Sequence, residues 1–339
     1  MKKTMKEIAE VCHVSTSLVS RIINKDPTLK CRPETIDRVI KEIEKNDFIP
    51  NQNARALAKS SMLTRRKITI GYVSYKGDNN QQMNAFFNSI AEGIISILNE
   101  ARCEVSGYYV DEIHEKYINK KPLSANRFDG IIIFGTLDDG ILTYLQSQCK
   151  YMSSIYGAFL PNYDFVGTDF NASLNPMLNL IKEYGYDQIG FVTGSEDLRN
   201  EAIKKYAESI GLSFDENYIF DGLNVTTAAY NKMNELLKEH KPPKCICCMN
   251  DEMAIGVINA LLDNNYAVPE DVSVTGHDDI MKASYCKVPI TTVRIFKEEI
   301  GRLITDLLLE RIYYGRKFPV KVLVPCEIVI RDSLKKNEG

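Results

Sequence analysis

The sequence has no tryptophan and only four histidines in 339 residues, so ring stacking on a ligand would have to rest on phenylalanine or tyrosine. No apolar run approaches the roughly 20 residues that span a bilayer, and no signal-peptide core follows the first residues. The nine cysteines are an odd number at irregular spacing, which favours reduced thiols over a disulfide framework. These absences predict a cytoplasmic chain with no membrane partner.

The motifs of common enzymes and metal sites are also missing. No Gly-x-Gly-x-x-Gly follows the first predicted strand, and there is neither a phosphate loop nor a Gly-x-Ser-x-Gly turn. Residues 245–248 contain a Cys-x-x-Cys without a second pair at zinc-like spacing, so buried, small apolar side chains are the favoured interpretation. The acidic pair at 138–139 is interpreted as the start of a helix. We therefore expect no enzyme activity, no metal and no cofactor.

The charge of the chain is divided unevenly between its two ends. Residues 1–67 carry 15 basic against 8 acidic side chains, whereas the remainder carries 27 basic against 37 acidic. Apolar residues make up 44% and charged residues 26%, which is ordinary for a globular chain of two or three domains. A small basic head on a larger acidic body suggests a polyanion-binding module joined to another function.

The basic head has the pattern of three short helices. A capping box from Thr4 to Glu7 begins the first helix, which ends near residue 11 or 12. Residues 13–15 form a turn, and Ser15 is predicted to cap a second helix over 16–23. The inward face of this second helix comprises Leu18, Val19, Ile22 and Ile23, and the opposite face comprises Thr16, Ser17, Ser20, Arg21 and Asn24.

A third helix is predicted from Pro33, with an apolar stripe of Ile36, Val39, Ile40 and Ile43. Three helices of which the second exposes small polar groups and one arginine suit helix-turn-helix docking in a DNA major groove. An ordinary helical subdomain with a solvated polar face fits the periodicity about equally well. A further short helix can begin at Asn51 and run to about residue 58, but its length makes it unstable alone, and a frayed linker is the alternative.

From residue 68 onward, short β-rich runs alternate with helical patterns. Strands are predicted at 68–75, 130–135, 188–193, 244–249 and 272–275, with helices that include 86–100 and 251–262. This alternation is typical of parallel, doubly wound α/β sheets. About 270 residues suit two such lobes, with a ligand expected in the crevice at the carboxyl ends of the strands.

Polar residues follow several of these predicted strands. Asn250 and Asp251 come after one strand, Asp278 and Asp279 after another, and Arg199 shortly after a third. Amide, carboxylate and guanidinium groups that converge would suit a ligand with several hydroxyl groups. For each residue alone, a helix cap or a surface ion pair is the better interpretation, and Asp251 is expected to cap the helix that follows it.

Residues 4–24 and 48–58 resemble the signature of the LacI/GalR family of bacterial transcription repressors. The family's Ala-x-x-x-Gly-Val-Ser…Thr-Val-Ser-Arg-Val-Leu-Asn appears between Ala9 and Asn24, with His13 at the usual glycine and Leu18 at the usual threonine. A histidine can adopt the left-handed turn at some cost, so the motif survives. The resemblance extends through the chain to a terminal strand that ends near Ser333.

This resemblance implies that the second helix reads bases and that Leu57 separates a base step in the minor groove. It also implies an effector site in the body. The DNA-binding residues so implied are Thr4, Ser15, Thr16, Ser17, Ser20, Arg21, Asn24, Asn51, Ala54 and Leu57, and the effector-binding residues are Tyr75, Arg199, Asn250 and Asp278. Phe220 and Leu223 stand near the expected place of a stacking ring, and Tyr156 stands where the family has an acidic effector residue.

The domain organisation implied is a helix-turn-helix domain at 1–47, a hinge helix and linker at 48–67, and a core at 68–335. The core would be a two-lobed, doubly wound α/β fold like that of periplasmic binding proteins. One lobe would hold about 68–165 and 294–324, and the other about 166–293 and 325–335.

The function implied is a homodimeric repressor that binds pseudo-palindromic operator DNA and is released by a small sugar. Segments at 24–29, 70–75 and 292–295 look closest to evolved-β-galactosidase-type and galactose-operon repressors, which favours a galactoside. Another sugar or a corepressor is the alternative within the family. Outside it, a sugar-binding protein without a regulatory role would need an export signal in place of the basic head, and a sugar-processing enzyme would need a catalytic pair.

Overall fold

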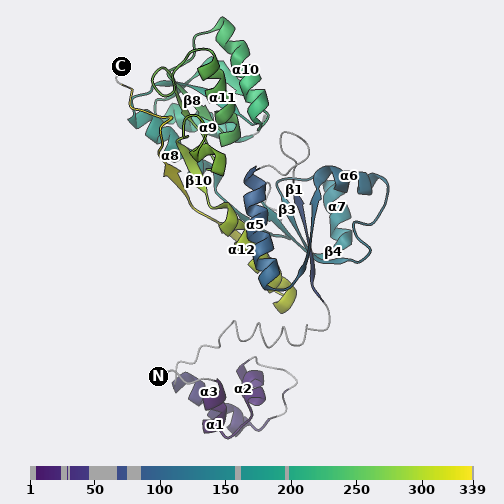
Figure 1. Ribbon diagram of the computed structural model, residues 1–339. Coiled ribbons are helices and arrows are strands. Elements are labelled where there is room, and N and C mark those ends of the chain that lie inside the picture. The colour runs from purple at the N-terminus through teal and green to yellow at the C-terminus, as the bar shows by residue number, and fades with distance from the viewer. Residues whose placement is uncertain are drawn as a thin grey trace. The chain divides into compact units, whose positions relative to one another are not determined.

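A computed structural model describes residues 5–23, 29, 31–45, 67–74, 85–156, 162–194 and 198–337 (Figure 1). The chain divides into two compact units, Met1–Arg66 and Lys67–Gly339. Among the described residues no helix is long and apolar enough to cross a membrane. The predicted hinge helix at 51–58 lies outside the described residues.

The first unit contains the three predicted helices, which are α1 (Met5–Val11), α2 (Thr16–Ile23) and α3 (Pro33–Lys45). Ile8, Val19 and Val39 are fully buried where the three helices meet. The turn between α1 and α2 contains His13 at a φ of +49°, so the left-handed conformation expected of this histidine is confirmed. Ser15 caps α2, because its hydroxyl accepts a hydrogen bond from the backbone N–H of Leu18 at 3.1 Å.

One residue of the predicted apolar stripe on α3 is not buried. Val39 is fully buried and Ile36 and Ile43 are half-buried, whereas Ile40 is 39% exposed. Ile40 lies at one edge of the stripe, and the packed residues of α1 and α2 cover the side that carries Val39. Helices α1 and α2 therefore cover only part of the apolar stripe that the periodicity of α3 predicts.

The first lobe of the second unit is a six-stranded parallel sheet in the order β11-β5-β4-β3-β1-β2. Its strands are β1 (Thr69–Ser74), β2 (Glu104–Tyr109), β3 (Phe128–Phe134), β4 (Cys149–Ile155), β5 (Asp164–Gly167) and β11 (Lys321–Leu323). Helices α5 (Ala85–Glu100) and α12 (Lys297–Tyr314) lie side by side on one face, and α6 (Val110–Ile118) and α7 (Asp139–Gln148) lie on the other (Figure 1). Strand β3 is buried by both layers, as its continuous apolar run predicts.

The second lobe is a four-stranded parallel sheet in the order β7-β6-β8-β9, with a separate antiparallel pair of β10 and β12. Its strands are β6 (Gln188–Thr193), β7 (Ser213–Asp221), β8 (Cys245–Cys248), β9 (Ser273–Thr275), β10 (Thr292–Ile295) and β12 (Cys326–Val329). Its helices are α8 (Phe170–Glu183), α9 (Leu198–Ser209), α10 (Thr226–Glu239), α11 (Asp251–Asp263) and the 3-10 helix η1 (Met281–Ser284). The chain thus passes between the lobes three times, before α8, before α12 and before β12.

Two glycines allow α5 and α12 to cross closely. A Cβ on Gly301 would overlap the backbone carbonyl oxygen of Ile90, and a Cβ on Gly93 would overlap that of Glu298. Backbone atoms cannot move aside as the end of a flexible side chain can. The two helices therefore need glycine at both positions to pack as they do.

We expect Gly301→Ala to lower the free energy of unfolding by about 2 kcal/mol or more, because overpacking at a tight contact forces the backbone to shift. Urea denaturation would measure the change. Gly71→Ala is a suitable control, since a Cβ there would meet its nearest neighbour at an ordinary 3.4 Å. Equal stability of the two variants would contradict the close helix crossing.

Candidate functional site

The exposed face of α2 is the first candidate site. Thr16, Ser17 and Arg21 are all exposed on this face, as the sequence predicts. They follow the Ser15 cap, so hydroxyl groups lie at the first turn of the helix and a guanidinium group lies one turn later. Thr4, Asn24, Asn51, Ala54 and Leu57 and the side chain of Ser20 lie outside the described residues.

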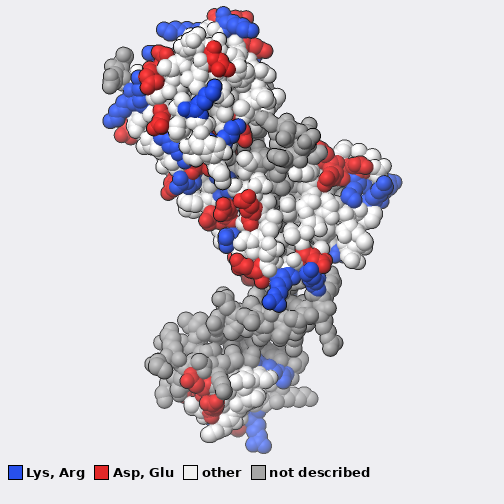
Figure 2. All heavy atoms as spheres, in the orientation of Figure 1, with Lys and Arg blue, Asp and Glu red and all other residues white. Residues whose placement is uncertain are grey.

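The second unit shows charges of both signs on the face that Figure 2 presents. Over the second lobe, Lys and Arg are interspersed with Asp and Glu on the face that is shown. The net acidic charge of residues beyond 67 also opposes binding to a polyanion. The α2 face of the head, with its exposed hydroxyl groups and Arg21, is therefore the candidate surface for DNA.

The carboxyl ends of β8 and β9 hold the second candidate site. These strands are parallel neighbours, and they bring Asn250 and Asp278, which follow them, to the same edge of the sheet. The Asn250 side chain accepts a hydrogen bond from the Met253 N–H at 2.8 Å, so Asn250 caps α11. Its amide group also donates to the side-chain oxygen of Asn224 at 3.1 Å. Asn224 was not predicted, since it follows a long, half-exposed strand with no strong pattern.

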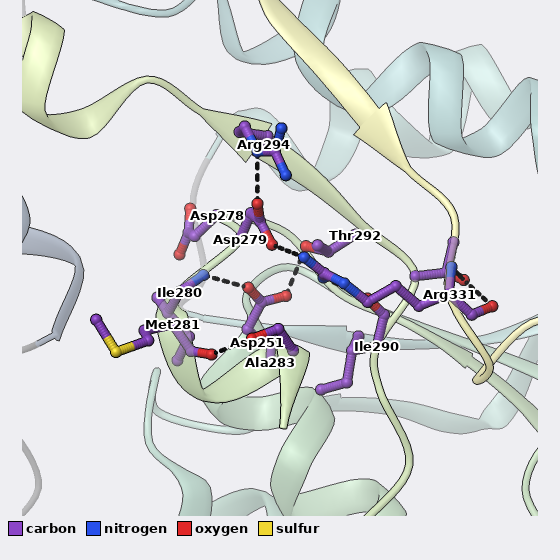
Figure 3. A network of polar contacts seen from close by, with 12 residues as sticks. Asp251, Asp278, Asp279, Ile280, Met281, Ala283, Ile290, Thr292, Arg294 and Arg331 are labelled. Atoms are coloured by element: carbon purple, nitrogen blue, oxygen red, sulfur yellow. Dashed lines mark hydrogen bonds and ion pairs between the residues drawn. The ribbon is translucent and has the colours of Figure 1, made fainter. Parts of the chain in front are cut away.

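Asp251 does not cap α11, so the expectation for this residue is wrong. Its side chain is fully buried and its carboxylate accepts hydrogen bonds from the Ile280 N–H at 2.9 Å and the Thr292 hydroxyl at 2.6 Å (Figure 3). Its own backbone N–H donates to the carbonyl of His277 at 2.8 Å. Burial raises the pKa of Asp251 well above its ordinary value, and the charge of Asp278 adds to this. Asp251 therefore holds the loop that carries Asp278.

Asp279 joins this loop to two arginines. Its carboxylate accepts from Arg294 at 2.6 Å and from Arg331 at 2.5 Å (Figure 3). Burial alone would raise the pKa of Asp279, but the hydrogen bonds from both guanidinium groups lower it overall. The double ion pair fixes a backbone in which Asp278 has a φ of +106° and Asp279 a φ of +50°.

The Asp278 carboxylate points away from this ion pair (Figure 3). One oxygen, Oδ1, accepts from Nδ1 of His277 at 2.9 Å, and the side chain is 18% exposed. Nζ of Lys297 donates to the backbone carbonyls of Asp278 and Asp279. Burial lowers the pKa of Lys297, although the nearby aspartates oppose this effect. Asp278 is thus a partly exposed carboxylate on a loop whose backbone is held rigidly.

The contacts of residues 277–279 extend to all three passages between the lobes. His277 contacts Ser173 in α8, which follows the first passage. Lys297 begins α12 and follows the second passage, and Arg331 lies just after β12, which follows the third. A ligand that moved this loop would therefore act on each connection between the lobes.

Tyr156, which directly follows β4 in the first lobe, is a further candidate. Burial raises its pKa, a hydrogen bond with Thr168 opposes this, and the negative charge of Asp278 raises it again. Tyr156 has a φ of +55°, and its ring centroid lies 5.3 Å from that of Phe86. The first lobe therefore places a half-buried phenol at the carboxyl end of β4.

The remaining predicted residues have different outcomes. Phe220 is 7% exposed and Leu223 is 63% exposed, so the second is the more accessible of the two. Arg199 lies in the first turn of α9, but its side chain and the whole of Tyr75 lie outside the described residues.

The cysteines of β8 are structural. All three are fully buried, and burial raises the pKa of each thiol, that of Cys247 to about 11. No cluster of potential metal ligands occurs in the part of the chain that the structure describes. The interpretation of residues 245–248 as small apolar core is confirmed.

Comparison with protein families gives two matches. Residues 4–51 match bacterial regulatory proteins of the lacI family, and residues 179–334 match the periplasmic binding protein-like domain. The chain is also 26% identical over 349 residues to the HTH-type transcriptional repressor MelR of Bacillus subtilis. That alignment covers 97% of this chain and 96% of the relative.

Two solved structures share the fold over nearly the whole chain. The complex of the transcriptional regulator CelR with cellobiose has a TM-score of 0.68 at 22% identity and covers 98% of this chain and 99% of that one. The lac repressor dimer bound to operator and the anti-inducer ONPF has a TM-score of 0.64 at 20% identity, with the same coverage. The predicted fold class, a helix-turn-helix head before a core like that of periplasmic binding proteins, is confirmed.

Proposed function

The chain belongs to the LacI family of bacterial transcription repressors, and from this premise we propose that it represses a sugar-utilisation operon and is released from DNA by a small sugar. It is a regulator and not an enzyme, because this chain and the MelR repressor align along nearly the entire length of both proteins. The observation that carries the DNA-binding part is the exposed face of α2, with Thr16, Ser17 and Arg21 on a helix capped by Ser15.

On DNA, the first turn of α2 enters the major groove, where the hydroxyl groups and the Arg21 guanidinium contact base edges. The protein acts as a homodimer, so two heads bind the two halves of a pseudo-palindromic operator. Asn51, Ala54 and Leu57 belong to a hinge helix that packs against its partner copy in the minor groove, with Leu57 as the wedge. The lac repressor structure, a dimer on operator DNA, supports this arrangement by its shared fold.

The sugar binds at the carboxyl ends of the strands, with Asp278, Asn250, Arg199 and Tyr75 as contacts. The exposed part of Asp278 supports this, because a carboxylate can accept hydrogen bonds from adjacent hydroxyl groups. The cellobiose complex of CelR supports a sugar in the same fold. A galactoside is the inducer we propose, on the three segments at 24–29, 70–75 and 292–295.

Release follows from a change in the populations of two lobe arrangements. A sugar that binds one arrangement more tightly shifts the equilibrium towards it by that difference in affinity. Because residues 277–279 contact segments beside all three passages, the sugar's contact with Asp278 changes the lobe arrangement directly. The altered lobes then separate the two hinge helices, which are too short to remain folded apart.

We expect Asp278→Ala to weaken sugar binding by about a hundredfold, because a hydrogen bond to a charged group contributes roughly 1.5–3 kcal/mol. A thermal-shift screen with galactose, lactose, cellobiose and related sugars would identify a ligand, and calorimetry would give both affinities. Asp263→Ala is the matched control, since this carboxylate is half exposed at the far end of α11. Unchanged affinity in Asp278→Ala would remove Asp278 from the sugar site.

A further inference from the structure

His277 is one of only four histidines in the chain, and it is buried beside the proposed sugar contact. It is 4% exposed and follows the buried strand β9 by two residues. Its two ring nitrogens have different partners, with Nδ1 2.9 Å from Oδ1 of Asp278 and Nε2 2.9 Å from the hydroxyl of Ser173. Ser173 is itself 1% exposed in α8. The three side chains form a chain of hydrogen bonds that ends at a partly exposed carboxylate.

The chemistry of these groups fixes where one proton lies. An ionised carboxylate can only accept, so Nδ1 of His277 must carry a proton and donate it to Asp278. The Ser173 hydroxyl forms its hydrogen bond with Nε2. It donates this hydrogen bond if the imidazole ring is neutral and accepts it if the ring is charged. A rotation of the imidazole ring by half a turn would break both hydrogen bonds, to Asp278 and to Ser173.

We propose that His277 is a positioning residue that holds the Asp278 carboxylate in the orientation that binds the sugar. This inference rests on the proposed function, because it concerns the same carboxylate. His277 occupies Oδ1, and Oδ2 has no hydrogen-bond donor among the residues that the structure describes, so one oxygen remains for the ligand. His277 itself stays buried and makes no contact with the sugar.

Among the residues that the structure describes, His277 is the side chain that donates to the Asp278 carboxylate. Nζ of Lys297 does not serve this purpose, because it donates to the backbone carbonyls of Asp278, Asp279 and Ile295 and so uses its three N–H groups. Without the donor at Nδ1, the Asp278 carboxylate would lose the hydrogen bond that fixes its orientation, and fewer of its orientations would suit the ligand. Asp279, by contrast, is held by Arg294 and Arg331 and needs no histidine.

Two nearly isosteric substitutions separate the hydrogen bond from the volume of the ring. In His277→Asn the amide nitrogen lies where Nδ1 does and can donate to Asp278, whereas His277→Leu fills the same space without a donor. We expect the Leu variant to bind the sugar found in the screen about tenfold more weakly than the unaltered protein. We expect the Asn variant to stay within about threefold of it. Equal affinities of the Leu and Asn variants would overturn the proposal.

Nuclear magnetic resonance of the full chain, labelled with ¹⁵N in histidine, tests the positioning without any ligand. The expected spectrum has one buried histidine with a proton on Nδ1, and its ring shifts move in Asp278→Ala. A proton only on Nε2, or shifts that ignore the Asp278 substitution, would overturn the proposal even if a variant failed to fold. If no sugar binds the unaltered protein but Nδ1 is protonated and responds to Asp278, the sugar proposal fails and the positioning of Asp278 stands.

Discussion

Replacing Arg21 by alanine is expected to weaken binding to the specific operator by roughly a thousandfold. One arginine that grips guanine with two hydrogen bonds contributes about 1–3 kcal/mol, and a dimer loses this contact in both half-sites. Arg21 is exposed in the last turn of α2, on the same side of the chain's basic head as Thr16 and Ser17. Fluorescence anisotropy with a labelled operator duplex and with an unrelated duplex would measure the loss of affinity for each.

Arg38→Ala is the matched control for this experiment. Arg38 is also exposed, but it lies on α3, so its removal lowers the positive charge of the head equally without altering the α2 face. We expect Arg38→Ala to weaken binding to both duplexes by a similar, small factor, because phosphate contacts do not depend on sequence. If Arg21→Ala discriminated between the two duplexes as well as the unaltered protein, α2 would not be the element that reads bases.

Replacing Asp164 by alanine is expected to lower the free energy of unfolding by about 3–5 kcal/mol, because it leaves a buried charge without its partner. Asp164 is fully buried at the start of β5 and accepts from the Arg316 guanidinium at 2.8 and 3.0 Å. Its Oδ1 also accepts from the Val320 N–H at 2.8 Å, and Arg311 lies 3.7 Å from Oδ2. The hydrogen bond from Arg316 to Asp164 also raises the pKa of this arginine. Urea denaturation at neutral pH would measure the change.

Glu310→Ala supplies the contrast for the same arginine. Glu310 contacts Nε of Arg316 at 3.0 Å, but its side chain is 43% exposed, so solvent screens the pair. We expect its removal to change the free energy of unfolding by less than about 1 kcal/mol. A similar loss of unfolding free energy in both variants would mean that the contribution of Asp164 to stability does not depend on its burial.

Much of the fold could be predicted because local patterns agree with the final packing. The Ser15 cap and the division of α2 into an apolar and a polar face depend only on residues near in sequence. The run at 188–193 is buried in β6, as its apolar residues predict. Of the strands without a prediction, β2, β7 and β11 lie at sheet edges, whereas β4 and β5 lie inside the first sheet. Strand β2 is half-exposed along its length, and β5 is four residues long and begins with the charged Asp164. Only their parallel partners make them strands.

The second candidate site could be predicted in part for the same reason. Asn250 and Asp278 follow apolar strands, so sequence places them at one edge of a sheet. The error for Asp251 arose because a carboxylate before a helix usually caps it, whereas here Asn250 does so and Asp251 turns inward to Thr292. Thr292 and Ser173 lie 41 and 104 residues from their partners, and no spacing rule connects such distant positions.

The central claim is that one ligand bound in the core controls DNA binding by the head. The most direct test measures the affinity of the full chain for a palindromic operator duplex with and without the sugar found in the screen, over a range of salt concentrations. The predicted result is an affinity that falls steeply with salt, as phosphate contacts require, and that falls further when the sugar saturates the core. An operator affinity that the bound sugar leaves unchanged at every salt concentration would contradict the account.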